Sequence, residues 1–240
     1  MERVKIGVFD SGIGGIPVMV KLKKEFPFVD FIYFGDNGNV PYGSRESKEI
    51  CELTLRGVNE LINAGANAVV LACNTASLNW RGEITGVKVF RLIPHIPETF
   101  RGEVGYFLGT PSTVSALRAS GAFSAFEHIR YFPLPYLAAA VEKSVFSDKE
   151  LVLADHLMTT EQNPAFVYLG CTHYLYYEGE IKRFFRCEKT FDGTDDLIKN
   201  IRENKEFSAR EICCKPSVSF VGAYAEKNSL AFSQYMKKWS

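Results

Sequence analysis

Two short apolar runs in this chain each end in a cysteine that is followed by small polar residues. The run 68–72 leads into Cys73, and the run 165–170 leads into Cys171. Apolar runs of this length, preceded by turn residues, are typical of buried strands in a parallel sheet. In open α/β sheets, ligands bind outside the carboxyl ends of the strands. The pattern therefore predicts an α/β fold in which two thiols, one from each half of the chain, face a single site.

A structural role for each cysteine is the alternative, because a lone buried cysteine is usually a small and inert core residue. The shared context favours chemistry. Polar side chains follow each thiol directly and mark a strand exit, where they need partners or a ligand. The remaining cysteines, at 51, 187, 213 and 214, match no zinc-ribbon spacing, and no role is assigned to Cys213 or Cys214.

Length and charge narrow the class of protein. The chain has 240 residues, and Lys+Arg and Asp+Glu both number 28, so the formal net charge is zero. This balance argues against nucleic acid or an anionic membrane as a main partner. The N-terminus enters a strand directly, without a signal peptide, and no stretch has the ~18 apolar residues of a membrane span. We therefore expect a cytoplasmic protein with reduced cysteines.

Strands and helices are expected to alternate, which predicts parallel βαβ units with right-handed connections. The pattern restarts after residue 94, so the two halves are expected to be pseudo-symmetric, each with a parallel four-stranded sheet flanked by helices. The last strand and helix are expected to return to the first half. Expected strands are 4–9, 31–34, 68–72, 87–93, 105–108, 129–134, 165–170, 189–191 and 217–221, and expected helices are 16–26, 47–64, 114–121, 136–145, 148–159, 195–202 and 225–238.

A glycine-rich turn at 10–15 follows the first strand. Gly12 and Gly14 fit a dinucleotide-binding fingerprint, but Pro17 stands where its third glycine should be. We therefore set a nucleotide site aside. The glycines still allow backbone N–H groups to approach an anionic ligand closely at the start of a helix.

Four motifs, at 9–15, 41–43, 72–77 and 170–174, stand in the order seen in glutamate racemases. The chain resembles this cofactor-independent aspartate/glutamate racemase superfamily over nearly its whole length. The resemblance implies two α/β domains with the active site in the cleft between them. The first domain would be discontinuous, 1–94 plus 193–240, and the second would be 95–192.

The resemblance also implies an isomerase that interconverts L- and D-glutamate without cofactor or metal and supplies D-glutamate for bacterial peptidoglycan in the cell wall. Cys73 and Cys171 would be the two catalytic bases. We consider a homodimer as the candidate assembly of this chain. The residues expected to bind the small-molecule substrate are Asp10, Ser11, Pro41, Tyr42, Gly43, Asn74, Thr75, Thr113, Thr172 and His173.

Racemisation removes a proton from one face of the α-carbon and delivers another to the opposite face, which a thiolate and a thiol on opposite walls can do. Each thiol has a candidate assistant. Asp10 ends a strand expected beside the Cys73 strand, and His173 lies two residues beyond Cys171, with Glu142 a further candidate on that side. The simpler alternatives are a helix cap for Asp10, a packing role for His173 and an exposed helix position for Glu142.

Few cations lie in the motifs, and Arg45 is the nearest. We therefore expect hydroxyls, amides and backbone N–H groups to hold the substrate carboxylates, without fixed ammonium groups. Two other classes of function remain open at this point. A Cys-dependent amidohydrolase using Cys73, His173 and Asp10 would leave Cys171 unexplained. A metal-binding module would use Cys73, Cys171 and His173 as ligands.

Overall fold

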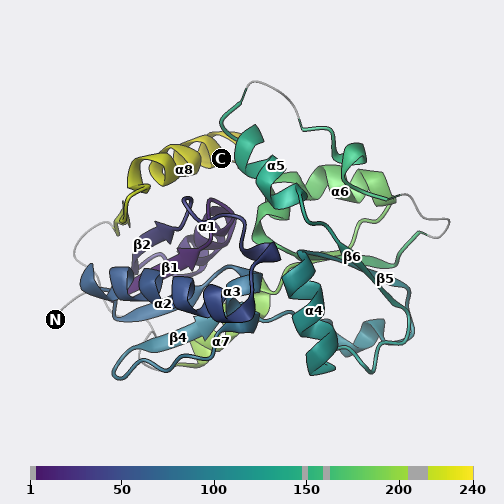
Figure 1. The fold of residues 1–240 in the computed structure, drawn as a ribbon, viewed down its shortest axis with the longest axis horizontal. Helices are drawn as coiled ribbons and strands as arrows, with labels where there is room; N and C mark the ends of the chain where they lie inside the picture. Colours follow the sequence, from purple (N-terminus) through teal and green to yellow (C-terminus); the bar gives the residue numbers. More distant parts are fainter. Residues whose placement is uncertain (1–3, 148–150, 159–162, 205–215, 240) are drawn as a thin grey trace.

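The computed structural model describes residues 4–147, 151–158, 163–204 and 216–239, which contain two separate parallel sheets (Figure 1). Cys213 and Cys214 lie outside these residues. The first sheet has the strand order β4-β3-β1-β2-β9, and the second has the order β6-β5-β7-β8. All neighbouring strands are parallel, as the alternation of strands and helices predicts. Their bounds are β1 Lys5–Asp10, β2 Asp30–Gly35, β3 Ala68–Leu71, β4 Lys88–Arg91, β5 Gly105–Gly109, β6 Ile129–Pro133, β7 Phe166–Gly170, β8 Thr190–Phe191 and β9 Val218–Phe220.

Strand β9 returns to the first half, as expected, and adds a fifth strand to the first sheet by pairing with β2. Helices cover both faces of each sheet. They are α1 Gly15–Glu25, α2 Ser47–Asn63, α3 Asn74–Asn79, α4 Pro111–Ser120, α5 Leu137–Ser144, α6 Glu178–Phe185, α7 Thr194–Glu203 and α8 Ala225–Trp239, with 3-10 turns η1 Tyr42–Ser44, η2 Glu98–Phe100, η3 Leu153–Asp155 and η4 Thr172–Tyr177.

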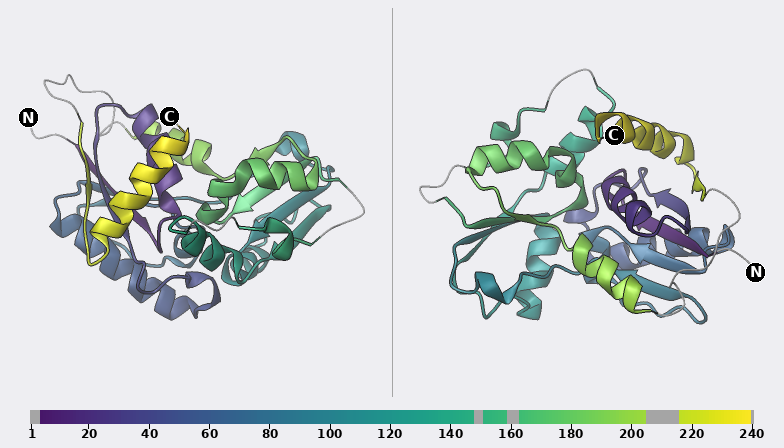
Figure 2. Two further views of the ribbon diagram at one scale, coloured as in Figure 1. Left: turned by 90° about the horizontal axis from the view of Figure 1, so that it is seen from above. Right: turned by 180° about the vertical axis from the view of Figure 1, so that it is seen from behind.

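The alternation of side chains along each strand decides which helices cover which face. In β1, Phe9 points toward α2 and packs with Leu53 and Leu61. Val8 points to the opposite face, where α1, α7 and α8 lie. In the second sheet, α4 covers one face, and α5 and α6 cover the other. Figure 2 shows these layers from two further directions, with α8 beside α1.

One buried apolar cluster extends across both sheets. It contains Val8 of β1, Leu169 of β7 and Val141 of α5. Because these residues come from both halves, burial of a common apolar surface stabilises the halves against each other.

Asp10 at the end of β1 bonds to Thr172 beyond β7. The hydroxyl of Thr75, beyond β3, lies 3.0 Å from that of Thr110, beyond β5. The carboxyl ends of these four strands therefore lie close together.

The prediction of a helix over 148–159 is wrong for residues 151–158, the part of this range that the structure describes. Residues 151–158 contain only the short turn η3. Leu153 and Leu157 are buried at helical spacing, and the backbone N–H of Leu157 donates to the carbonyl of Leu153. One turn is enough to bury both side chains, so the spacing does not require a longer helix.

Helix α6 was missed because only Ile181 and Phe185, at positions i and i+4, are buried along it. Its other residues are largely polar, so the apolar pattern is weak. Among the described residues, no helix combines the length and apolar character needed to span a bilayer.

Candidate active site

Cys73 lies two residues beyond β3, at the N-terminal boundary of α3. Its side chain is 6% exposed. The thiol donates to the hydroxyl of Ser11, with Sγ and Oγ 3.5 Å apart. Strand β1 pairs with β3, so Asp10 ends beside this thiol, as expected. Burial, followed by the negative charge of Asp10, raises the pKa of Cys73 to about 12.

Cys171 holds the equivalent position in the second sheet, directly after β7. It is 7% exposed. The Nδ1 atom of His173 lies 3.8 Å from its Sγ. A negative charge on Cys171 is among the causes that raise the pKa of Cys73, so the two thiols are near enough to influence each other electrostatically. The thiols thus come from separate sheets and lie within electrostatic reach of each other.

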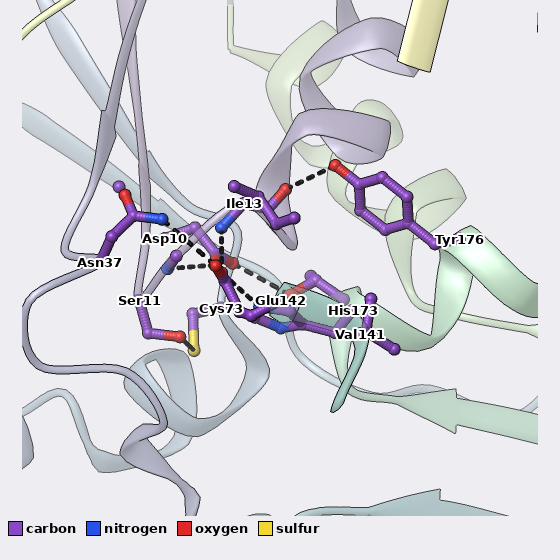
Figure 3. Close-up of polar contacts among 12 residues, drawn as sticks. Asp10, Ser11, Ile13, Asn37, Cys73, Val141, Glu142, His173 and Tyr176 are labelled. Atoms are coloured by element: carbon purple, nitrogen blue, oxygen red, sulfur yellow. Dashed lines mark hydrogen bonds and ion pairs between the residues drawn. The ribbon is translucent and has the colours of Figure 1, made fainter. Parts of the chain in front are cut away.

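His173 is joined to Glu142 through Nε2 (Figure 3). Its other ring nitrogen, Nδ1, faces Cys171. The distance from Nε2 to Oε1 is 3.0 Å, and both side chains are buried. Burial would lower the pKa of His173, but its contacts with Cys171 and Glu142 outweigh this and raise it well above the ordinary value. In the protonated ring both nitrogens donate, one to Glu142 and one toward Cys171. Glu142 is therefore not the exposed helix position considered as its alternative.

The glycine-rich turn binds an anion that belongs to the protein itself. The backbone N–H of Ile13 donates to Oε1 of Glu142 at 2.7 Å. A Cβ atom on Gly12 would lie 2.0 Å from that same oxygen. The close approach expected for a ligand is therefore occupied by a carboxylate from α5. The lack of a side chain at Gly12 makes room for it.

Asp10 is fully buried and accepts two hydrogen bonds. The backbone N–H of Gly12 donates to Oδ1 at 2.9 Å, and the hydroxyl of Thr172 donates to Oδ2 at 3.0 Å. Burial raises the pKa of Asp10, while His173 and these two bonds oppose the rise. Helix α1 has no side-chain cap, so the cap role considered for Asp10 is wrong.

Hydroxyl and amide side chains gather beside Cys73. The hydroxyl of Thr75 lies 3.0 Å from that of Thr110 and 2.9 Å from that of Thr113. Asn74 is 1% exposed, and neither Oδ1 nor Nδ2 of its amide has a protein partner. A buried amide without partners is costly, which makes Asn74 a candidate ligand-binding group.

The loop with Pro41, Tyr42 and Gly43 lies against the same cluster. Gly43 packs so closely on Thr110 that a Cβ there would lie 2.4 Å from the Thr110 Cβ. Tyr42 is buried in the apolar cluster that includes Cys73, but its hydroxyl donates to Asp36 at 2.8 Å. Pro41 is half-buried beside it.

The polar cluster adjoins an open space through Asn79, which donates from Nδ2 to the carbonyl of Thr75 at 2.8 Å and toward Ser112 at 3.3 Å. A cavity of about 680 Å³ is lined in part by Gly43, Asn79 and Ser112. The lining also includes Arg45, which pairs with Glu49.

Sequence reasoning missed two polar residues of this site. Asn37 and Lys227 both approach Oε2 of Glu142, with Nδ2 at 3.4 Å and Nζ at 3.2 Å. The expectation of a site without fixed ammonium groups is therefore wrong on the Glu142 side. Neither residue belongs to a motif, and no spacing in the sequence indicates them.

The structure does not join Cys73, His173 and Asp10 by the hydrogen bonds that the amidohydrolase alternative requires. His173 pairs with Cys171 and Glu142, and Asp10 bonds to Thr172 and Gly12. Among the described residues, no group of three or more His, Cys, Asp or Glu side chains is placed to hold a metal ion.

Comparisons with known proteins identify relatives by sequence and by structure. No family model matches the chain. A glutamate racemase of Clostridium acetobutylicum is 30% identical over 212 residues, 82% of each chain. The crystal structure of glutamate racemase from Campylobacter jejuni superposes with a TM-score of 0.80 at 20% identity, covering 99% of this chain and 100% of that one. The Francisella tularensis glutamate racemase, solved in complex with D-glutamate, gives a TM-score of 0.73 at 21% identity over 98% and 95% of the two chains.

Proposed function

The chain belongs to the glutamate racemase family, and we propose that Cys73 and Cys171 are the two groups that exchange a proton with the α-carbon of glutamate. The family reaction is a cofactor-independent isomerisation between L- and D-glutamate, and D-glutamate is a component of bacterial peptidoglycan. The observation that carries the proposal is the similar position of the two thiols, each within two residues of the carboxyl end of an interior strand of its own sheet.

The two thiols have different polar neighbours. The His173 ring, paired with Glu142 through Nε2, turns Nδ1 toward the sulfur of Cys171. Burial raises the pKa of Cys73 to about 12, which favours its protonated form and leaves its thiolate the less populated state. In one direction Cys171 removes the α-proton while Cys73 delivers a proton to the opposite face. After this transfer the charges are exchanged, and the reverse reaction starts from Cys73.

Neutral groups hold the substrate in this proposal. The unpartnered amide of Asn74 supplies both a donor and an acceptor. The hydroxyls of Ser11, Thr75, Thr113 and Thr172 lie on the same side of the two sheets, around the thiols. The cavity beside Gly43 gives substrate a route toward this cluster. Glutamate is the substrate inferred, in line with the D-glutamate held by the Francisella protein.

We place the domain boundaries at 94–95 and 192–193. The change in packing near residue 192 supports the second boundary, because β8 belongs to the second sheet whereas α7 packs on α1 and β4. The cytoplasm is the proposed location, since glutamate racemases supply a precursor made there. A homodimer is the proposed assembly, and light scattering of the purified protein measures it.

The test combines racemisation with a half-reaction. Circular dichroism polarimetry of L- and D-glutamate, without added cofactor, should show turnover by the wild type and none by Cys73→Ala or Cys171→Ala. A glutamate analogue with a leaving group on the β-carbon loses that group after a single deprotonation. Each variant should therefore eliminate from one enantiomer only, and the two variants should prefer opposite enantiomers.

Cys187→Ala is the matched control, because Cys187 is also buried but its thiol donates to the carbonyl of Lys189. It should racemise and eliminate as the wild type does. If Cys73→Ala and Cys171→Ala prefer the same enantiomer, or if either racemises normally, the two-thiol proposal is wrong. Hydrolysis of an amide substrate without solvent deuterium exchange at the α-carbon would instead favour the amidohydrolase.

A further inference from the structure

Glu142 lies where the two halves of the chain meet, and its carboxylate contacts groups from both. Oε1 accepts from the backbone of Ile13 and lies 3.0 Å from His173 Nε2. Oε2 faces the amide of Asn37 and, at 3.2 Å, the ammonium of Lys227. The orientation of the carboxylate is therefore fixed by partners on both oxygens.

Lys227 comes from the first turn of α8, far from the site in sequence. Cations near a helix N-terminus are disfavoured by the helix dipole, so this position carries an electrostatic cost. Two contacts from the second half offset it. The ammonium pairs with Glu142 and lies 5.1 Å above the ring of Phe146. The side chain is 37% exposed, so its charge is partly solvated while its end reaches the buried carboxylate.

The direct contacts of the Glu142 carboxylate continue through His173 to the sulfur of Cys171. The titratable groups that influence or contact this carboxylate are His173 and Tyr176 of η4, Asp10 of β1, Tyr33 of β2 and Lys227 of α8. Of these, His173 has a direct contact with a thiol, because its Nδ1 lies 3.8 Å from Cys171 Sγ, whereas Asp10 influences Cys73 through its charge. Cys73 instead has Ser11 and Asp10 beside it.

We propose that Lys227 is a positioning residue for the Cys171 half of the reaction: its ammonium fixes the Glu142 carboxylate, which holds the His173 ring against the Cys171 sulfur. The inference rests on the proposed roles of the two thiols. Lys227 touches neither thiol, so it acts through Glu142 and His173. Its loss should therefore slow proton transfer by Cys171 and leave proton transfer by Cys73 unchanged.

The experiment separates the two halves by using one thiol at a time. Lys227→Met is introduced into the Cys73→Ala chain, where elimination depends on Cys171, and into the Cys171→Ala chain, where it depends on Cys73. We expect elimination to fall about 5-fold in the first background, the order for a partly exposed charge-assisted contact, and to change less than about 2-fold in the second. With both thiols present, kcat for racemisation should fall while KM for glutamate stays within about 2-fold.

Three further variants make the result specific. Lys227→Arg should restore most of the lost rate, because it returns a cation to the carboxylate. Lys238→Met removes another α8 cation that contacts the second half, where Nζ lies 5.6 Å from the centre of the Tyr177 ring, and should leave both backgrounds unchanged. If Lys227→Met proves unstable on thermal unfolding, Lys227→Gln, which keeps a neutral donor, replaces it. Elimination should again fall in the Cys73→Ala background and stay unchanged in the Cys171→Ala background.

An equal loss in both backgrounds would mean that Lys227 only docks α8, and no loss in either would mean that Glu142 is held without it. Each outcome overturns the inference. The two-thiol proposal fails separately, through the absence of opposite enantiomer preferences in Cys73→Ala and Cys171→Ala chains that retain Lys227.

Discussion

The hydroxyl of Thr172 donates to the carboxylate of Asp10, with Oγ1 and Oδ2 3.0 Å apart, although the residues are 162 positions apart in the chain. Thr172 directly follows one thiol, and Asp10 is the charged neighbour of the other. This bond orients the Asp10 carboxylate from the opposite half of the molecule. The two sides of the site are thus connected through their polar groups as well as through the apolar core.

Thr172→Val should lower racemisation about 10-fold, because it leaves one oxygen of the buried Asp10 carboxylate without its hydroxyl donor. Thr172→Ser keeps the hydroxyl and should retain most of the activity. Circular dichroism assays of both variants measure the difference. Equal activity in the two would show that the bond does not matter for turnover.

His173→Asn and Asp10→Asn should each reduce turnover by about 10²-fold or more, the range for loss of acid–base assistance. The loss should fall mainly on Cys171-dependent elimination for His173→Asn and on Cys73-dependent elimination for Asp10→Asn. His128→Asn, at an exposed position, is the control for the substitution. If both site variants turn over at the wild-type rate, the assistant roles are wrong.

Gly12→Ala should abolish most activity without unfolding the chain, because its Cβ would lie 2.0 Å from Oε1 of Glu142 and 3.3 Å from Nε2 of His173. Gly179→Ala is the matched control, since the nearest atom to its Cβ is a terminal nitrogen of Arg183 at 3.7 Å. That substitution should leave activity intact and helix α6 unchanged or slightly more stable. Turnover by Gly12→Ala at the wild-type rate would contradict the tight packing of the turn.

Acid should weaken the Glu142 contact in a defined pH range. Burial raises the pKa of Glu142, but His173, the Ile13 N–H and Lys227 outweigh it and hold the pKa at about 2. A carboxyl whose folded pKa is lowered stabilises the fold above its ordinary value of about 4.3 and loses this as the pH falls toward the folded pKa. The raised pKa of His173 acts oppositely, so its contribution is complete below about 6.5 and is lost as the pH rises from there through its folded pKa.

Urea unfolding from pH 3 to 7 measures this effect. The free energy of unfolding of wild type should exceed that of Glu142→Gln at about pH 5 to 6, and the difference should shrink as the pH falls below about 4. A difference that stays constant or grows in acid would show that the carboxylate is not held in its charged form.

Glutamate should be preferred over aspartate by about 10-fold or more in kcat/KM, the discrimination that one methylene group can supply. The curated relatives that match this chain at 30% and 32% identity are glutamate racemases, which supports glutamate as the preferred substrate. Parallel assays with both amino acids measure the ratio. Equal or faster turnover of aspartate would contradict this preference.

The sequence was sufficient to place each thiol at the carboxyl end of a strand in its own sheet, because apolar runs that end in polar residues mark strand exits. That the two sheets face one site was the expectation taken from the shared pattern and the family resemblance. The neighbour of each thiol was also predictable. Asp10 ends the strand beside β3, and His173 is two residues from Cys171.

The contacts of Glu142 were not predictable in the same way. They depend on how α5, the turn at Gly12 and α8 pack in three dimensions, and no local pattern carries that information. Lys227 looks like an ordinary helix cation in sequence. The helix expected at 148–159 failed because the spacing of Leu153 and Leu157 fits a single turn as well as a long helix.

The return of β9 to the first sheet has a consequence for synthesis on the ribosome. Every strand of the second sheet precedes β9 in the chain, yet β9 pairs with β2, which is made much earlier. Translation therefore supplies all the residues of the second sheet before the first sheet can be completed. The half that carries Cys73 is therefore the first to be started and the last to be completed. Until β9 is synthesised, the edge of β2 that pairs with β9 has no strand beside it.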